Sequence, residues 1–240
     1  AVQELHIERT RQRGIVGNIY LAKVARVLPG MQSAFIDIGL ERAAFIHFND
    51  LGEPQTGGQI EKVLFEGQTL LVQVLKDPLG TKGARLTRQI SIAGRNLVYL
   101  PQIYRPLDQE IHIGISQKIE NPEEREALKN RLKGLIPADE SGDIIVRTSA
   151  EQVSDETLIS DLKYLRITWQ QIAQRAKEKS APVLLHQDLN LAERVLRYMA
   201  GPETSQIRID SAENFERLTQ FAQMFMPQLS SKLTLYRGER

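Results

Sequence analysis

The stretch RGIVGNIYLAKVARVLPGMQSAFIDIG, residues 13–39, decides the fold of the first part of the chain. Its segment 15–28 is rich in Val and Ile and ends at Pro29-Gly30, a dipeptide that marks a turn. Residues 34–39 then form a second, shorter run of β-type residues. We therefore predict two consecutive strands joined by a tight turn, which open a β-rich unit.

Three further β-type runs follow before residue 91. They are residues 43–48, residues 69–76 and residues 85–90. Glycine-rich segments and an Asp-Pro dipeptide separate them, as is typical of turns. Five short strands within about eighty residues predict a small closed barrel, and the five-stranded OB-fold is the usual form at this size.

Alternation along the two short strands predicts which side chains point outward. If the Ala and Ile residues of 34–38 line the barrel, Phe35 lies on its outer surface. The same reasoning places Phe45 and His47 of the next strand on the outside. Exposed rings are unfavourable unless a partner covers them. This face of an OB-fold holds single-stranded nucleic acid, and bases stack on such rings.

Basic residues gather in the first hundred positions. The formal net charge is +1, but residues 1–100 hold twelve Lys and Arg against nine Asp and Glu. Two stretches contain bases and no acids: Arg9, Arg11, Arg13, Lys23 and Arg26, and then Lys82, Arg85, Arg88 and Arg95. Such strips indicate an anionic partner, and we expect Lys82 and Arg85 to contact phosphate. The alternative is that both rings are buried under a second domain, but two rings in register beside a basic strip favour nucleic acid.

After about residue 120, the hydrophobic pattern changes from the alternation of strands to the longer period of helices. Asn121 and Ser154 are good N-caps, and they predict helices over 122–134 and 154–179 with a strand over 143–148 between them. The long helix has one apolar seam, made of Leu158, Leu162, Leu165, Trp169, Ile172 and Ala176. We expect this seam to pack on another helix or on the barrel wall, with the tryptophan in the core.

The last part of the chain alternates between helix and strand. Helices are predicted over 189–200 and 211–225, and strands over 206–210 and 231–236. This order indicates a small α/β unit. The whole chain is therefore predicted to be an α+β protein.

Composition excludes several classes of protein. The 240 residues contain no cysteine, which excludes a disulfide framework, a thiolate zinc site and a cysteine nucleophile. No apolar run reaches the roughly 18 residues of a membrane span, and the start at Ala1 does not resemble a signal peptide. The four histidines are scattered, and the carboxylates form no recognisable two-metal cluster. We expect neither catalytic nor metal-binding residues in this chain.

Three stretches carry a family resemblance. Residues 13–39, KDPLGTKGARLT (76–87) and GDIIVRTSAE (142–151) are similar to the RNase E/RNase G endoribonucleases, with the closer likeness to the RNase G branch. The resemblance runs in order through nearly the whole chain. It implies that the chain is the amino-terminal part of a longer protein, without the catalytic nuclease domain.

The resemblance also implies a domain organisation. An OB-fold RNA-binding domain would occupy 13–95, and an α/β 5′-sensor segment with the long helix would occupy 96–185. Residues 1–12 and 186–240 would be two pieces of an RNase H-like subdomain.

Residue roles follow from the same resemblance. Phe35, Phe45 and Lys82 fall where the family contacts RNA, on the face predicted above from alternation. Arg85 and His47 lie beside them in the sequence pattern, and we include both as candidate RNA-binding residues.

The 5′-sensor would recognise an RNA terminus that carries a monophosphate. Arg147 and Thr148 sit at the family's phosphate-binding Arg-Thr pair, with Gly94 and Val98 on a neighbouring wall. A terminal monophosphate carries about −1.5 to −2 charges and three acceptor oxygens, which a guanidinium fork and a hydroxyl match well. The family often has a basic residue or a basic pair where this chain has Gln117-Lys118, so Lys118 is the one cation there.

An activity is implied for the full-length protein. It would be an endoribonuclease that cleaves single-stranded RNA bearing a 5′-monophosphate, in ribosomal RNA 5′-end maturation and mRNA decay. The family binds magnesium through TVDIN-like and IDFIDM-like motifs and zinc through a CPxCxG-like motif, and none of these occurs here. We therefore expect this piece to be inactive alone, and magnesium and structural zinc only in the full-length enzyme. We also expect a cytoplasmic location and a homo-oligomeric full-length protein, with a monomeric state left open for this piece.

Two alternatives remain at this point. The chain could be a non-catalytic OB-fold RNA-binding protein whose helical part docks on the ribosome or on another protein. It could also be a structural scaffold in which the 154–179 helix mediates assembly and the rings are buried. The first predicts RNA binding without recognition of the 5′ end, and the second predicts that Phe35 and Phe45 are inaccessible.

Overall fold

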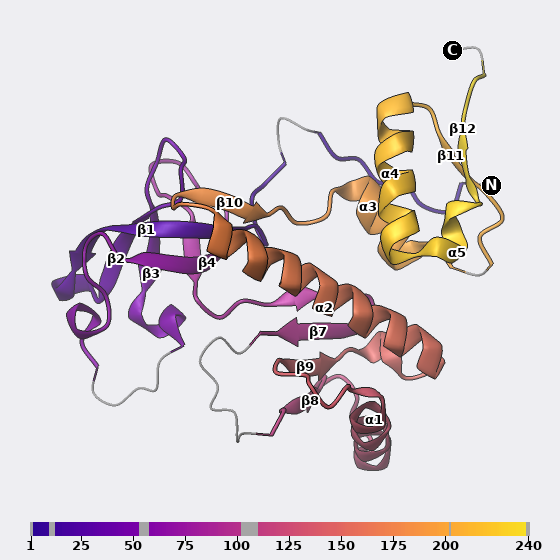
Figure 1. Cartoon of the computed structure of the whole chain (residues 1–240), viewed down its shortest axis with the longest axis horizontal. Helices are drawn as coiled ribbons and strands as arrows, with labels where there is room; N and C mark the ends of the chain where they lie inside the picture. Colours follow the sequence, from indigo (N-terminus) through magenta and orange to yellow (C-terminus); the bar gives the residue numbers. More distant parts are fainter. Residues whose placement is uncertain (1, 10–12, 53–57, 102–109, 202, 239–240) are drawn as a thin grey trace. The chain divides into compact units, whose positions relative to one another are not determined.

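The computed structural model of the chain describes residues 2–9, 13–52, 58–101, 110–201 and 203–238 (Figure 1). The chain divides into two compact units, 13–188 and 1–12 together with 189–240. In the described ranges, no helix is both long enough and apolar enough to cross a membrane. Arg11, one of the predicted basic positions, lies outside the described residues.

The first part of the 13–188 unit is a closed barrel. Its strands are β1 (Ile19–Leu28), β2 (Ser33–Asp37), β3 (Ala44–His47), β4 (Thr69–Lys76) and β5 (Arg85–Thr87). They pair in the order β1-β2-β3-β5-β4, and β4 pairs back with β1. The short 3₁₀ helices η2 (Pro29–Met31), η3 (Phe48–Leu51) and η4 (Ile60–Lys62) lie between strands. The predicted five-stranded barrel of an α+β, OB-fold-like protein is confirmed.

One face of each barrel strand forms the core. Ile36, Ile46, Val72 and Leu86, from four different strands, are fully buried in a single apolar cluster. Burying an Ile, Val or Leu side chain contributes about 1.5–3 kcal/mol. The core therefore fixes which residues of β2 and β3 point outward.

The first strand starts later than predicted. The strand expected from residue 15 begins at Ile19, because Asn18 N donates to the Ile15 carbonyl in a turn. Gly17 in that turn has a φ of +87°, a conformation that favours glycine. An extra strand, β10 (Val183–His186), pairs with the start of β1 and was not predicted.

A second sheet follows the barrel in the same unit. Its strands are β6 (Ile92–Ala93), β7 (Leu97–Leu100), β8 (Ile113–Ile115) and β9 (Asp143–Val146), in the order β6-β7-β9-β8. Only β9 was predicted, and it stops at Val146 because the 3₁₀ helix η5 (Thr148–Ala150) begins two residues later. The other strands have two to four residues, which is too short for a clear alternation.

The two long helices begin at their predicted caps. In α1 (Pro122–Leu135), Asn121 Oδ1 accepts from Glu123 N at 2.9 Å. In α2 (Asp155–Glu178), Ser154 Oγ accepts from Thr157 N at 3.3 Å. These side chains satisfy backbone N–H groups that have no partner inside the helix.

One side of α2 covers the second sheet. Leu158, Leu162, Leu165 and Ile172 of the predicted seam are buried. The helix lies against β6 and β7, and it also contacts α1 and β10 (Figure 1). A helix and the barrel wall were the expected partners of the seam, and α2 contacts both through α1 and β10. It also lies against β6 and β7, strands that were not predicted. Trp169 is half-buried and not a core residue, because the buried face of α2 passes through its neighbour Thr168 and leaves Trp169 at the rim.

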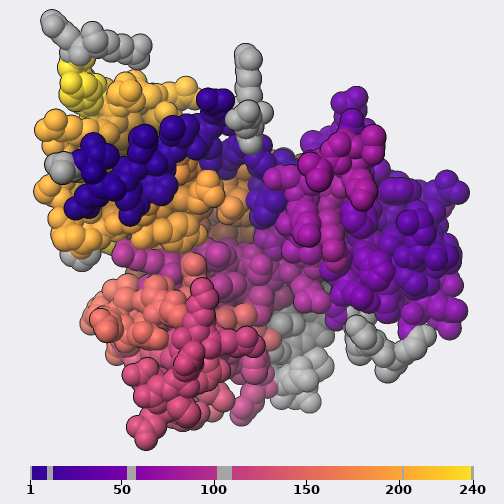
Figure 2. All heavy atoms as spheres, turned by 180° about the vertical axis from the view of Figure 1, so that it is seen from behind, coloured from indigo at the N-terminus to yellow at the C-terminus, as the bar shows by residue number. Residues whose placement is uncertain are grey.

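The other compact unit combines the first residues with 189–240. Its elements are α3 (Leu191–Arg194), the π-helical turn η6 (Val195–Met199), β11 (Ile207–Ile209), α4 (Ala212–Phe225), α5 (Pro227–Ser230) and β12 (Leu233–Leu235). The helix predicted over 189–200 widens into the π turn because Ala200 N donates to the Val195 carbonyl. Residues 2–9 lie on the surface of this unit (Figure 2), where Glu8 pairs with Arg194 at 2.8 Å.

Candidate nucleic-acid interface

Two phenylalanines lie side by side on the outside of the barrel. β2 and β3 are antiparallel, and their register places Phe35 directly opposite Phe45. The neighbouring Ile36 and Ile46 are fully buried, so the two rings project from the opposite face, as alternation predicts. Phe35 is 42% exposed and Phe45 is half-buried. The rings form a platform on which bases can stack.

Basic residues flank the two rings in the same cross-strand row. Arg26 of β1 lies opposite Phe35, and Arg85 of β5 lies beside Phe45. Paired residues project from the same face of a sheet. The sequence indicates Arg26 only as part of a basic strip, because alternation from the buried Val24 would point it inward. A β-bulge between Val24 and Arg26 shifts the register by one residue and turns Arg26 outward.

Arg85 is already paired with a carboxylate. Its Nε donates to Asp50 Oδ2 at 3.0 Å, and its Nη2 donates to Asp50 Oδ1 at 3.3 Å. The Asp50 side chain is 15% exposed and the Arg85 side chain 38% exposed. A phosphate would therefore have to compete with a well-placed carboxylate for this guanidinium. An RNA contact by Arg85 stays a prediction, but Arg85 is not the freely available cation that the sequence indicated.

Lys82 lies near the tip of the hairpin between β4 and β5. It pairs with Leu79 across a two-residue turn, with backbone hydrogen bonds of 3.0 and 3.1 Å. A Cβ on Gly83 would lie 1.9 Å from the Ala43 carbonyl oxygen, so glycine is required for this close approach. This close contact between Gly83 and the residue before β3 holds the hairpin against the start of that strand. Lys82 is exposed and projects from a braced segment next to the strand that carries the second ring.

His47 has a structural role in the same strand. Its Nδ1 accepts from Asn49 N at 3.2 Å, which caps the start of η3. The ring is half-buried and lies on the same side of β3 as Phe45. Contact between His47 and RNA stays a prediction.

A second group of predicted residues meets at one edge of the second sheet. β8 and β9 are parallel, so both end at this edge, and β7 is antiparallel to β9, so it begins there. The edge therefore carries Gly94 in the β6–β7 turn, Arg147 and Thr148 after β9, and Lys118 after β8. Ser116 N donates to the Val146 carbonyl at 2.8 Å, which extends the pairing of these two segments.

Arg147 is exposed and bound to the β6–β7 turn. Its Nη1 donates to the Gly94 carbonyl at 2.7 Å, and its backbone N donates to the Asn96 carbonyl at 2.8 Å. Within the described ranges, no carboxylate forms an ion pair with Arg147, in contrast to Arg85. The remaining guanidinium N–H groups can donate to a phosphate, and the exposed Thr148 adds a hydroxyl beside them.

Val98 and Lys118 lie on neighbouring parts of this edge. Val98 is half-buried, and it points away from the sheet face on which Leu97 and Tyr99 are buried. Lys118 is exposed and lies in a turn that hydrogen bonds from Arg125 of α1 hold in place. The Arg125 Nη1 donates to the carbonyls of the turn at 2.7 and 2.9 Å.

The far end of β9 is held by a buried polar cluster. Tyr99 Oη donates to Glu140 Oε1 at 2.7 Å, and the same carboxylate oxygen accepts from Ser141 N and Gly142 N. Burial, and then the hydrogen bond to Glu140, raise the pKa of Tyr99 above its usual value. The phenol thus stays neutral and keeps donating to the carboxylate. This cluster fixes the start of β9, the strand that Arg147 follows.

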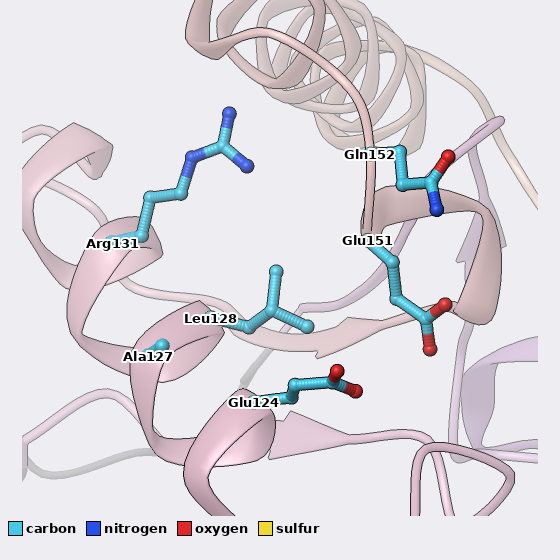
Figure 3. Close-up of a pocket in the computed structure, with 6 residues that line it drawn as sticks. All are labelled: Glu124, Ala127, Leu128, Arg131, Glu151 and Gln152. Carbon is cyan, nitrogen blue, oxygen red and sulfur yellow. The ribbon is translucent and has the colours of Figure 1, made fainter. Parts of the chain in front are cut away.

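A cavity of about 280 Å³ lies between α1 and the segment after η5 (Figure 3). It is lined by Glu124, Ala127, Leu128, Arg131, Glu151 and Gln152. The Arg131 Nε is paired with Asp155 at 2.6 Å. The carboxylates of Glu124 and Glu151 also line the cavity, and their negative charge opposes phosphate binding. The cavity contains none of the predicted site residues and is not a candidate RNA site.

Comparison with known proteins shows which family the chain is similar to. A model of the Ribonuclease E/G family matches residues 91–240. The chain belongs to this family. Ribonuclease G of Escherichia coli (strain K12) is 45% identical across the whole chain, and Ribonuclease G of Haemophilus influenzae is 42% identical across the whole chain. Ribonuclease E of the cyanobacterium Synechocystis is 39% identical over 91% of the chain and 32% of its own length.

Membership of the ribonuclease E/G family confirms the resemblance, with the greater likeness to RNase G. The chain spans about half the length of these RNase G relatives, 49% in each case. Within the part of the chain that the structure describes, no three His, Asp or Glu side chains are grouped to hold a metal ion. The described residues therefore do not fit a magnesium or zinc site, and we assign them no chemical step through a metal.

Proposed function

We propose that this chain is the RNA-binding and 5′-monophosphate-sensing half of an RNase G-type endoribonuclease. The observation that carries the proposal is the convergence of Arg147, Thr148 and the Gly94 turn at one sheet edge, with Lys118 after the neighbouring strand. The paired rings on the barrel supply a separate surface that would bind single-stranded RNA.

The two surfaces would have different tasks. Stacking on Phe35 and Phe45 tolerates any base, since every base has a π-face, so the barrel would supply affinity without reading sequence. The guanidinium of Arg147 would grip the terminal phosphate with two parallel hydrogen bonds, and the Thr148 hydroxyl would add a third. A 5′-hydroxyl end offers no such charge, so the sheet edge would distinguish the two ends of otherwise identical RNAs.

The proposal extends to the complete protein. It would hydrolyse single-stranded RNA in the cytoplasm, in ribosomal RNA 5′-end maturation and mRNA decay, as a homo-oligomer with magnesium and structural zinc bound outside this chain. The 240 residues alone would bind RNA and not cut it. The names of the relatives, Ribonuclease G and Ribonuclease E, support an RNA-processing role.

Binding of two short single-stranded RNAs of one sequence, one ending in 5′-monophosphate and one in 5′-hydroxyl, tests the proposal. We expect the wild-type chain to prefer the monophosphate, and Arg147→Ala to lose about 10- to 150-fold of that preference, since a hydrogen bond to a charged group is worth about 1.5–3 kcal/mol. Arg208→Ala is the matched control, because Arg208 is an exposed arginine on β11, outside the 13–188 unit. An equal affinity of the wild-type chain for both RNAs would show that it binds RNA without sensing the 5′ end.

A further inference from the structure

A buried carboxylate from α2 holds the turn that carries Gly94. Asp161 is 1% exposed. Its Oδ1 accepts from Arg95 N at 3.0 Å, and its Oδ2 accepts from Asn96 N at 2.8 Å and from Leu97 N at 2.9 Å. Three consecutive backbone N–H groups thus donate to one side chain, and bonds to a charged acceptor are stronger than those to a neutral one.

The carbonyl side of the same turn is bound to the end of β9. The Gly94 carbonyl accepts from Arg147 Nη1 at 2.7 Å, and the Arg95 carbonyl accepts from Ser149 Oγ at 2.8 Å. The Asn96 carbonyl accepts from Arg147 N at 2.8 Å. The turn therefore lies between Asp161, which holds its N–H groups, and residues 147–149, which hold its carbonyls.

Gly94 leaves room for this carboxylate. A Cβ at position 94 would lie 2.6 Å from Asp161 Oδ2 and 2.7 Å from Oδ1. Non-bonded carbon and oxygen atoms do not approach this closely, so a side chain here would displace the carboxylate. The absence of a side chain at Gly94 is thus explained by Asp161 inside the protein, without any contact to a ligand.

We propose that Asp161 is a positioning residue for the phosphate-binding edge. It fixes the turn, the Gly94 carbonyl then fixes one Nη of Arg147, and the guanidinium presents its remaining N–H groups in one orientation. This inference rests on the proposed function of the edge. It adds that recognition of the RNA end depends on a side chain that is itself buried and does not touch the RNA.

The substitution Asp161→Asn tests the proposal in the binding assay described above. It keeps the shape of the side chain but replaces one acceptor oxygen with an NH₂ group that faces backbone donors. We expect the preference for 5′-monophosphate over 5′-hydroxyl RNA to fall about fivefold, which corresponds to about 1 kcal/mol, the net worth of one hydrogen bond. Affinity for the 5′-hydroxyl RNA should stay unchanged, because the barrel surface is intact.

A loss of stability alone would not change this ratio. Leu165→Ala is the matched control, because Leu165 is a fully buried residue of the same helix with no bond to the turn. It should lower the melting temperature and leave the preference at its wild-type value. In amide NMR spectra of Asp161→Asn, the resonances of those residues among 95–97 that faced the replaced oxygen should move upfield, since their hydrogen bond to a carboxylate oxygen is lost.

The outcomes separate this inference from the proposed function. If wild type prefers the monophosphate and Arg147→Ala abolishes the preference, an unchanged ratio in Asp161→Asn overturns the role of Asp161 alone. If wild type shows no preference, the proposed function fails and the inference fails with it. Should Asp161→Asn not fold, Gly94→Ala displaces the same carboxylate with its added methyl group. A wild-type ratio in folded Gly94→Ala would then overturn the proposal.

Discussion

Removal of the Phe35 ring should weaken RNA binding and lower the stability of the fold only modestly. A base stacked on an aromatic ring contributes about 1–3 kcal/mol, so Phe35→Ala should raise the Kd for single-stranded RNA by about 5- to 150-fold. Phe35 is 42% exposed. Full burial of a Phe side chain contributes about 1.5–3 kcal/mol, so its partial burial corresponds to a loss of about 1–1.5 kcal/mol in the free energy of unfolding.

The adjacent residue of the same strand provides the matched control. Ile36 is fully buried and points into the barrel. Ile36→Ala should cost about 2–5 kcal/mol of stability, because it leaves a cavity in a packed core. The folded fraction of Ile36→Ala should bind RNA with the wild-type Kd. One substitution thus affects mainly binding and its neighbour mainly stability, as the alternation of β2 requires.

Fluorescence anisotropy with a labelled single-stranded RNA, repeated at several salt concentrations, measures these effects. Phe35→Ala should leave the dependence of log K on log salt unchanged, because no phosphate contact is lost. Lys82→Ala should reduce the magnitude of that slope by about 0.7, the value for one phosphate contact on a single strand. Phe35→Tyr keeps the ring and should bind nearly as wild type. A Kd within twofold of wild type for folded Phe35→Ala would refute the stacking role.

Two further predictions concern the unit that carries both surfaces. The Asn96 side chain is fully buried, and in the described residues neither its nitrogen nor its oxygen has a hydrogen-bond partner. Asn96→Leu should therefore raise the free energy of unfolding by about 1–3 kcal/mol in chemical denaturation, and a lower value than wild type would contradict this. Burial lowers the pKa of His186 below its usual value of about 6.5, so the fold disfavours the charged ring. The unfolded chain therefore protonates His186 at a higher pH than the folded protein does. The free energy of unfolding is highest above about pH 6.5 and falls as the pH is lowered, so the melting temperature should drop between about pH 7 and pH 5. His186→Gln should flatten that profile, and an equal drop in the variant would exclude His186 as its cause.

Much of the fold follows from patterns that act within a few residues. The strand positions of 69–76 and the caps at Asn121 and Ser154 agree with the structure. The outward direction of Phe35 and Phe45 also follows from the sequence, because a period of two is a local property of the chain. These features depend on neighbours that are close in the sequence, so composition and spacing are sufficient to predict them.

Other features depend on residues that are far apart in the sequence. The bulge that turns Arg26 outward arises from pairing between β1 and β2. The ion pair of Arg85 with Asp50 joins positions 35 residues apart, and the bond from Asp161 to Arg95 N joins positions 66 apart. No local period encodes such contacts.

The sequence by itself determined the barrel, its outward rings and the helix caps, because turn residues, alternation and capping are short-range preferences. Only the tertiary structure decided which cations stay free for a ligand and which are paired with a carboxylate. Arg85 begins one short strand and Arg147 follows another, yet Arg85 lies against Asp50 and Arg147 against a backbone carbonyl. The physical reason is that the charge a group offers to a ligand depends on what the fold places within hydrogen-bond distance of it.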